Sequence, residues 1–285
     1  MRWQGGRESD NVEDRRGMPG GPTVITGGLG TLVIILVALY FGVDPQALLN
    51  QTGGPMPGAS SGQAPGPSDG PEDENEKFVR TILADTEDVW HEQFRKMGRN
   101  YRDPKLVLFS GRVDSACGLA SAAVGPFYCP ADQKVYLDLG FFQQLKDQFG
   151  APGDFARAYV IAHEIGHHVQ NQLGISERMQ QARARLSPEE YNKLSVRLEL
   201  QADFLAGVWA HHAQRTRQFL EQGDVEDALR AATAIGDDRL QMESKGYVAP
   251  DSFTHGTSAQ RVRWFKKGLQ SGNIADGDTF NSNDL

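Results

Sequence analysis

The feature of this sequence that most constrains its fold is the run His163-Glu164-Ile165-Gly166-His167, which lies inside a stretch with helical apolar periodicity, Phe155 to Val169. Residues four apart on a helix are neighbours about 5–6 Å apart, so the two imidazoles can reach one metal ion. Glu164 lies three residues before His167 and shares that face of the helix. The spacing therefore predicts a helix that holds a metal ion beside a carboxylate.

A carboxylate in this place has a chemical use. Glu164 can accept a proton from a water on the metal and pass it to a leaving amine, which is how two histidines and a glutamate in this pattern work in zinc peptidases. A motif of three residues of ordinary abundance can also occur in a sequence by chance. The histidines would then be partly exposed helix residues, with Glu164 solvated beside them.

A second helical pattern downstream supplies the ligand that such a site lacks. It begins with Ser187 as the cap, Pro188 at the first helical position and Glu190 three residues after the cap. A catalytic zinc site needs three protein ligands and one open position, so Glu199 completes a set of two histidines and one glutamate. Asp203, one turn further on, can hold a ligand histidine by its other ring nitrogen. Taken singly, both acids would belong to a solvated helix face.

Four motifs, in this order, give the chain a family resemblance. It resembles the bacterial neutral zinc metallopeptidase family of membrane-anchored proteins, within the gluzincin group that includes thermolysin, over roughly residues 77 to 270. The motifs are Gly125-Pro-Phe-Tyr-Cys-Pro-Ala-Asp-Gln-Lys-Val-Tyr-Leu-Asp138, His163-Glu-Ile-Gly-His-His-Val-Gln170, Glu199-Leu-Gln-Ala-Asp203 and Thr254-His-Gly-Thr-Ser-Ala-Gln-Arg261. The resemblance implies a zinc-dependent peptidase with one Zn²⁺ per chain.

The last motif adds a loop histidine. By the resemblance, His255 and Arg261 are similar in position to a histidine and an arginine that follow the metal helices of short gluzincins, where the histidine can stabilise the oxyanion or approach the zinc. A donor aimed at that oxygen lowers the barrier by a few kcal/mol. The proline that usually follows this histidine is Gly256 here, which predicts a more flexible loop. The alternative to a catalytic role is an ordinary surface histidine.

Composition limits the class of protein. With 285 residues, 39% hydrophobic and 23% charged, the chain can hold one globular domain of about 200 residues besides other segments. Its formal net charge of −8 argues against binding of nucleic acid, which relies on clustered Lys and Arg.

The N-terminal part is expected to lie outside the folded domain. Residues 1–22 are polar and Gly-rich and are predicted to be disordered. Residues 23–43 carry no charge and are apolar enough to span a bilayer as a helix. Residues 44–76, rich in Gly, Pro and Ser, are predicted to be a flexible linker to a metallopeptidase domain at 77–285. A cleaved signal peptide is the alternative for 23–43, although the leader before it is long.

Charge on the two sides of this predicted span sets its orientation. No Lys or Arg follows the span until Lys77, whereas four arginines precede it, namely Arg2, Arg7, Arg15 and Arg16. Because positive charge stays inside, the N-terminus is predicted to be cytoplasmic and the catalytic domain extracytoplasmic. The expected location is the inner membrane, with a single span.

The chain has two cysteines, Cys117 and Cys129, twelve residues apart. Outside the cytoplasm, a disulfide between them would stabilise the fold by about 3 kcal/mol. Two reduced, buried thiols are the alternative. Zinc binding by this pair is not expected, because no further cysteine completes a ligand set.

The order of elements predicts an α+β fold: a mostly helical, gluzincin-type domain with a small β-sheet, preceded by one transmembrane helix. We expect a first helix across Phe78 to Phe94, a strand at Lys105 to Phe109, a hairpin from Val124 to Leu139 and helices from about Gly153 onward. By the resemblance, the strand Lys134 to Leu139 is the open edge that holds an extended peptide by main-chain hydrogen bonds. Loops of the chain could instead cover that edge.

Together these features predict a membrane-anchored, zinc-dependent endopeptidase whose substrate is a peptide or an unfolded protein. The alternative is a tethered, latent module for binding, quality control or scaffolding that keeps the peptidase fold. The intact Glu164 favours the enzyme, because a binding module has no need of a general base. Another divalent metal could fill the same ligands.

Overall fold

The computed structural model describes residues 1–17 and 73–285 of the chain. One sheet has the strand order β1-β2-β6-β5, and a separate hairpin pairs β3 with β4. In the larger sheet β1 (Val12–Asp14), β2 (Lys105–Phe109) and β6 (Lys134–Asp138) are parallel, whereas β5 (Phe127–Cys129) runs antiparallel to β6. The hairpin consists of β3 (Arg112–Ser115) and β4 (Gly118–Ser121). A mostly helical α+β domain with small sheets agrees with the prediction.

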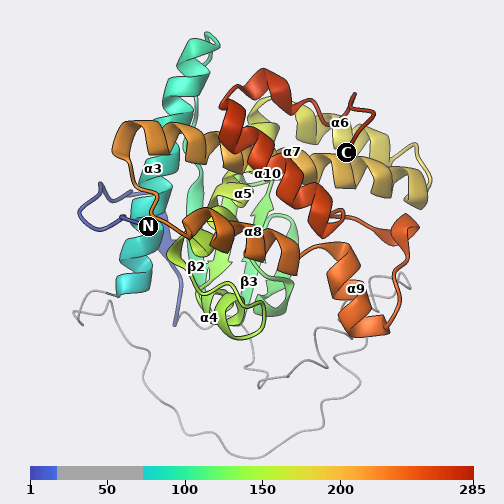
Figure 1. Cartoon of the computed structure of the whole chain (residues 1–285), viewed down its shortest axis with the longest axis horizontal. Helices are drawn as coiled ribbons and strands as arrows, with labels where there is room; N and C mark the ends of the chain where they lie inside the picture. The colour runs from blue at the N-terminus through green and yellow to red at the C-terminus, as the bar shows by residue number, and fades with distance from the viewer. Residues whose placement is uncertain (18–72) are drawn as a thin grey trace, which may run out of the picture.

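Helices make up most of the described chain, and α3 stands along one side of it in Figure 1. They are α3 (Glu74–Lys96), α4 (Gly140–Asp147), α5 (Asp154–Gln172), α6 (Ile175–Arg183), α7 (Pro188–Arg217), α8 (Asp224–Ala234), α9 (Asp237–Lys245) and α10 (Ser258–Ser271), with 3-10 turns at Ala122–Val124, Pro250–Ser252 and Ile274–Gly277. The short helix α4 was not predicted, because it lies in the turn between the hairpin and the metal motif.

The start of α7 is as predicted. Ser187 accepts a hydrogen bond from the backbone of Glu190, the side chain of Glu190 accepts one from the backbone of Ser187, and Pro188 opens the helix. This capping box satisfies backbone N–H groups that have no partner within the helix. It fixes where α7 begins and hence which of its residues face α5.

Close contacts between helices depend on small residues. A Cβ atom at Gly166 of α5 would lie 3.0 Å from the carbonyl oxygen of Ala202 on α7. At Gly268 of α10 it would lie 2.0 Å from the carbonyl oxygen of Phe204 on α7. Glycine therefore lets the backbones of α5 and α10 approach α7. The first of these contacts lies within the metal motif itself.

The N-terminal segment differs from the prediction. Residues 1–17 are packed on the domain, where β1 extends the sheet beside β2. Trp3 Nε1 donates to Asp154 Oδ2 at 2.9 Å, and Arg7 Nη2 donates to Glu87 Oε2 at 2.8 Å. The predicted disorder of residues 1–22 is therefore wrong for residues 1–17. A strand of three residues whose partners lie many residues away leaves almost no local signal in the sequence.

The predicted membrane span is corrected on two grounds. Within residues 1–17 and 73–285, no helix is both long enough and apolar enough to cross a bilayer. The predicted span at 23–43 lies outside these described residues, as does most of the predicted linker. The predicted orientation is also wrong, because β1 pairs with β2. The N-terminal segment and the domain form one folded body, so they cannot lie on opposite sides of a membrane.

The predicted hairpin exists, but its second strand is not an edge. β5 pairs with β6 in the register Phe127 to Tyr136, and β6 also pairs with β2 along its whole length. The prediction that Lys134 to Leu139 is the open edge is therefore wrong. The sequence could not show this, because β2 and β6 are joined by parallel pairing across a long connection. The strand at that end of the sheet is β5.

Candidate metal centre

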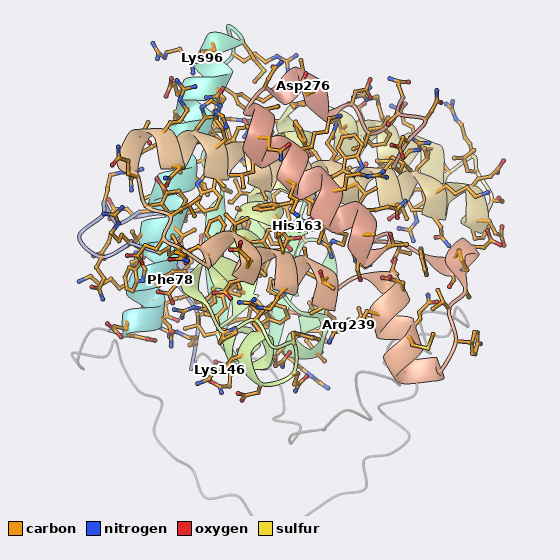
Figure 2. The ribbon with its side chains drawn as sticks, in the orientation of Figure 1. Phe78, Lys96, Lys146, His163, Arg239 and Asp276 are labelled. Carbon is orange, nitrogen blue, oxygen red and sulfur yellow. A yellow bond between two sulfur atoms is a disulfide. The ribbon has the colours of Figure 1, made fainter. Side chains whose placement is uncertain are left out.

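Two helices bring the predicted ligands together. His163, Glu164 and His167 lie on α5, and Glu199 and Asp203 lie on α7. His163 lies in the interior of the domain, under the crossing helices (Figure 2). The close approach at Gly166 lets Glu199 reach the two histidines. The sequence spacing therefore places all three side chains at one point between α5 and α7.

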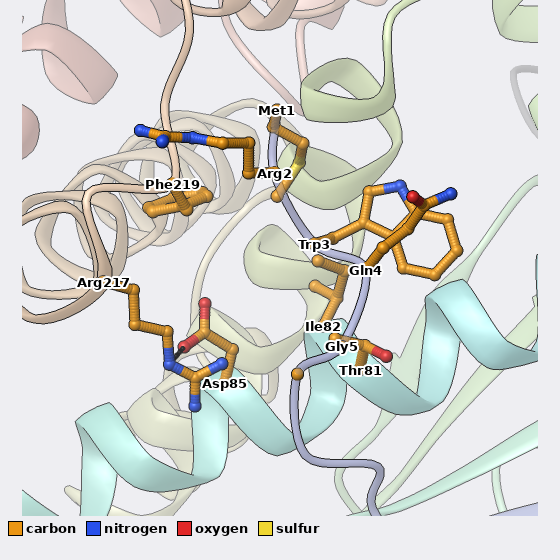
Figure 3. A pocket seen from close by; sticks show the side chains of 11 residues that line it. Met1, Arg2, Trp3, Gln4, Gly5, Thr81, Ile82, Asp85, Arg217 and Phe219 are labelled. Carbon is orange, nitrogen blue, oxygen red and sulfur yellow. Dashed lines mark ion pairs between the residues drawn. The ribbon is translucent and has the colours of Figure 1, made fainter.

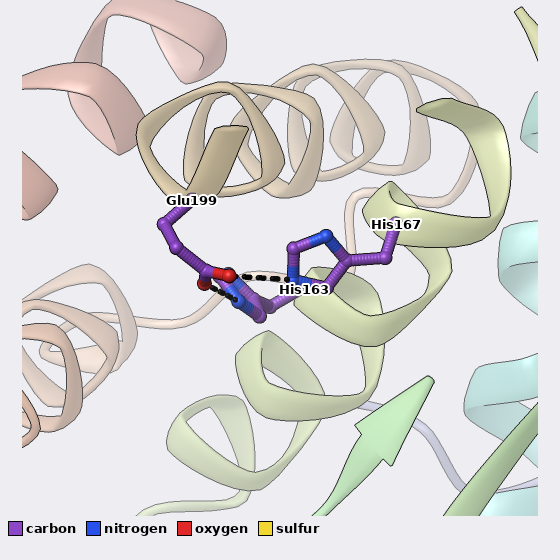
Figure 4. Close-up of side chains that lie close together, drawn as sticks. All are labelled: His163, His167 and Glu199. Carbon is purple, nitrogen blue, oxygen red and sulfur yellow. Dashed lines mark hydrogen bonds and ion pairs between the residues drawn. The ribbon is translucent and has the colours of Figure 1, made fainter. Parts of the chain in front are cut away.

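The three candidate ligands converge in the structure. One atom from each of His163, His167 and Glu199 lies within 4.8 Å of the other two. Figure 4 shows the carboxylate facing both rings, with Oε2 at 3.1 Å from His163 Nε2 and Oε1 at 3.4 Å from His167 Nε2. Two imidazole nitrogens and one carboxylate oxygen are a donor set that suits a catalytic zinc ion, with one position left open. The residues present therefore fit Zn²⁺.

Asp203 orients the first histidine. Its Oδ1 lies 2.8 Å from His163 Nδ1, so Nε2 of that ring is directed to Glu199. Oδ1 also accepts a 2.5 Å hydrogen bond from the Tyr159 hydroxyl, and Oδ2 accepts one of 2.8 Å from Arg261 Nε. Burial raises the pKa of Asp203, but the charges of Arg261 and His163 outweigh it and lower the pKa to about 2. Asp203 therefore stays a carboxylate.

Gln170 orients the second histidine, and sequence reasoning missed it. Its Oε1 lies 2.9 Å from His167 Nδ1, and its Nε2 donates to Leu198 O at 2.7 Å and to Gln201 Oε1 at 3.1 Å. Gln170 is fully buried and lies three residues after His167 on α5. That spacing was a signal that could have identified it. The two ligand histidines are thus held differently, one by a carboxylate and one by a neutral amide.

The ligand set is strongly coupled by charge. Burial lowers the pKa of His163, but Asp203 and Glu199 outweigh it and raise the pKa to about 10. Burial raises the pKa of Glu199, yet the charge of His167 and hydrogen bonds from both rings hold it well below its usual range. A metal ion has to compete with protons for these nitrogens. Metal affinity should therefore fall as the pH is lowered.

Glu164 is poised beside the cluster. It is only 8% exposed, and within residues 1–17 and 73–285 its carboxylate has no hydrogen-bond or ion-pair partner. Its oxygens are not among the enclosed side-chain atoms that have no hydrogen-bond partner, so water reaches them. The Glu164 carboxylate therefore lies on α5 next to the candidate ligand His163 and has no such contact of its own in the described part of the chain.

The structure separates His255 from Arg261. The His255 side chain is half exposed on a loop before α10, whereas Arg261 is buried against Asp203. Gly256 has φ +89°, and a Cβ there would lie 3.1 Å from Val196 Cγ1 on α7. The loop packs on α7, and its backbone conformation at this position requires glycine, which gives Gly256 a structural use that the sequence did not predict.

A disulfide joins Cys117, at the turn of the β3–β4 hairpin, to Cys129 in β5. Cys129 is fully buried, whereas Cys117 lies at the surface. The bond ties the hairpin to the last strand of the sheet. That strand packs on α5, since the Tyr128 hydroxyl lies 3.0 Å from Asn171 Nδ2 and from His168 Nδ1.

Two histidines and one carboxylate, held between two helices and oriented by buried partners, form a candidate metal site whose donor set suits the catalytic zinc ion of a hydrolase. The chain belongs to the family described as "Putative neutral zinc metallopeptidase", whose model matches residues 1–280, and this membership supports a zinc peptidase role. The match includes the N-terminal segment that packs on the domain. It is therefore wider than the resemblance from 77 to 270.

The curated relatives are similar to the chain over most of its length. It is 53% identical over 289 residues to the uncharacterized protein YpfJ of Escherichia coli (strain K12), covering 98% of this chain and 99% of that protein. It is 41% identical over 265 residues to the uncharacterized protein Rv2575 of Mycobacterium tuberculosis, covering 87% and 86%. No solved structure matches the chain.

Proposed function

We propose that this chain is a zinc-dependent endopeptidase of the two-histidine, one-glutamate type, in which His163, His167 and Glu199 hold the metal. The observation that carries the proposal is the convergence of these three ligands within 4.8 Å, next to a carboxylate that has no partner in the described part of the chain. A zinc ion in such a ligand set lowers the pKa of a bound water to about 7 and polarises a carbonyl.

Residues of the chain carry out the other parts of the proposed reaction. Glu164 accepts the proton of the attacking water and hands it to the leaving amine. Asp203 and Gln170 keep the two ligand rings in place by their Nδ1 atoms. His255 donates from Nε2 to the carbonyl oxygen as negative charge develops on it. The expected substrate is a peptide or an unfolded protein, because the reaction needs an extended backbone.

The end strand β5 replaces β6 as the candidate for holding that backbone. β5 has a paired neighbour on one side only within the described sheet, and it contacts α5 through Tyr128. A strand in this position can take up an extended peptide by main-chain hydrogen bonds. Recognition of this kind gives loose side-chain preference, which suits an unfolded protein as the substrate.

The test compares the full chain with Glu164→Gln and with Glu226→Gln, an exposed glutamate on α8 that serves as the matched control. Zinc content and cleavage of casein are measured on all three. We expect one zinc per chain in each, and cleavage that falls by about 10²–10⁴-fold only in Glu164→Gln. Full activity of Glu164→Gln would show that Glu164 is not the general base. A separate variant, Glu199→Ala, tests the third ligand: if it still binds one zinc per chain, Glu199 is not a ligand. Zinc without cleavage in the parent would favour the latent binding module.

A further inference from the structure

One carboxylate organises the loop that carries His255. Asp237 opens α9, is 8% exposed, and uses Oδ2 to accept hydrogen bonds from three consecutive backbone N–H groups. These come from Thr254 at 2.7 Å, His255 at 2.6 Å and Gly256 at 3.0 Å. In return, the Asp237 N–H donates to the Gly256 carbonyl at 3.0 Å. The backbone on both sides of His255 is thereby fixed to α9.

The other oxygen of Asp237 faces the imidazole. Oδ1 lies 3.3 Å from His255 Nδ1, and the Thr254 hydroxyl oxygen lies 2.9 Å from the same nitrogen. A carboxylate can only accept, whereas a hydroxyl can accept or donate. A ring nitrogen set against both is therefore the protonated one, Nδ1–H. Nε2 is left at the open end of a half-exposed side chain.

The loop is also placed next to a metal ligand. Gly256 packs on α7 against Val196 and Leu200, which lie three residues before and one residue after Glu199 in the sequence. Burial lowers the pKa of His255, but the hydrogen bond to Asp237 and the charge of Glu199 outweigh it and raise the pKa. The loop that carries His255 therefore packs on α7 within about one turn of Glu199.

We propose that Asp237 is a positioning residue of the active site, which shapes the loop 254–256 and holds the His255 ring by Nδ1, so that Nε2 is left available to the substrate. This inference rests on the proposed function, in which Nε2–H donates to the carbonyl oxygen of the substrate. A neutral ring with its proton on Nδ1 has a bare Nε2 that only accepts, so Nε2 donates only when the ring carries both protons. Asp237 accepts from Nδ1–H and thereby fixes the orientation of that ring. When both nitrogens carry protons, Asp237 balances the charge of the ring.

The next residue provides a matched control. Asp238 lies in the same turn of α9, and its Oδ1 accepts hydrogen bonds of 2.8 Å from the backbone N–H and from the hydroxyl of Ser258. It therefore holds the start of α10 with the same chemistry, but no hydrogen bond joins it to His255. Loss of Asp238 measures the structural effect of an acid in this turn.

The kinetic test uses the zinc-loaded full chain and the variants Asp237→Ala, His255→Gln, Asp238→Asn and the double variant Asp237→Ala/His255→Gln. We expect kcat on casein to fall by about 10–100-fold in the first two with one zinc per chain retained, and no further fall in the double variant. Asp238→Asn should lower Tm without lowering kcat. Parental kcat in Asp237→Ala, or single effects that multiply in the double variant, would overturn the proposal.

A second readout does not require cleavage. In Asp237→Asn the three backbone N–H groups still need an acceptor, so the amide NH2 takes the place of Oδ1 and His255 Nδ1 loses its proton. NMR of the chain labelled with ¹⁵N-histidine, assigned with His255→Gln, should show Nδ1–H in the parent and a bare Nδ1 in Asp237→Asn. If the parent cuts nothing, the proposed function fails, yet this change of tautomer still supports the positioning role. A bare Nδ1 in both proteins would overturn it.

Discussion

Arg261 and Asp203 form an ion pair that is closed off from water between α10 and α7. Nε of Arg261 lies 2.8 Å from Oδ2 of Asp203, with the two side chains 3% and 0% exposed. The other oxygen of Asp203 faces His163. The pair therefore links the last helix to the metal centre, and this buried role differs from that of the half-exposed His255.

Removal of this arginine tests the link. Arg261→Gln leaves Asp203 as a buried carboxylate without a charged partner except the histidine, so we expect a loss of about 3–5 kcal/mol in the free energy of unfolding. Zinc affinity should fall too, because His163 is held less firmly. Urea unfolding and zinc titration measure the two effects.

Arg263 is the control for that change, since it lies on the same helix and pairs with Asp284 at the surface, where the side chains are 45% and 87% exposed. Arg263→Gln should change stability by less than about 1 kcal/mol. If Arg261→Gln unfolds at the same urea concentration as Arg263→Gln, the buried pair contributes nothing of note.

Replacement of Gln170 should weaken zinc binding although all three ligands remain. In Gln170→Ala, His167 loses the acceptor of its Nδ1–H, so the dissociation constant for zinc should rise by about 10–100-fold. Competition with a chelating dye measures it. The exposed Gln180 on α6 provides the control, Gln180→Ala. Equal dissociation constants for the two variants would mean that other contacts orient the His167 ring.

The candidate ligands could be predicted because their geometry is local. His163 and His167 lie on one helix face at fixed spacing, and Glu199 and Asp203 repeat that spacing on a second capped helix. What joins the two helices is not local. The hydroxyl of Tyr159 and the guanidinium of Arg261 reach Asp203 only after α5, α7 and α10 have packed. These contacts therefore leave no periodic pattern in the sequence from which they could be predicted.

The sheet shows the same limit. The antiparallel β5–β6 hairpin could be predicted from a turn between two apolar runs. The parallel pairs that place β2 between β1 and β6 could not, because a parallel neighbour is separated by a long connection and leaves no turn signal. Both the buried position of β6 and the folding of residues 1–17 onto the domain follow from those pairs.

The disulfide should contribute to stability and leave the metal centre intact. Reduction, or the double change Cys117→Ala and Cys129→Ala, frees the hairpin from β5, and the chain-entropy model gives a loss of about 3 kcal/mol for a loop of this size. Zinc content should stay at one per chain, because neither cysteine contacts the ligands. Urea unfolding with and without dithiothreitol measures the loss. Dithiothreitol should not change the stability of the double variant. If it does not change the stability of the parent either, the prediction is contradicted.

Asp85 should make the fold less stable as the pH rises. Its side chain is 6% exposed and lies 3.2 Å from Arg217 Nε, in a pocket that the first residues of the chain also line (Figure 3). Burial raises the pKa of Asp85 to about 6, although Arg217 opposes this, whereas the ordinary value is 3.8. Between about pH 4 and pH 6 the folded chain binds more protons than the unfolded chain, so stability falls as the pH rises through that window.

Asp85→Asn removes this ionisation. At pH 7 we expect the variant to be more stable than the parent by about 2–3 kcal/mol, and near pH 4 we expect the two to be alike. Urea unfolding at several pH values gives the two curves. Asp114→Asn, an exposed change on β3, controls for the loss of one negative charge and should run parallel to the parent. If the curve of Asp85→Asn also stays parallel to the parent from pH 4 to pH 7, Asp85 ionises in the folded chain as it does in the unfolded one.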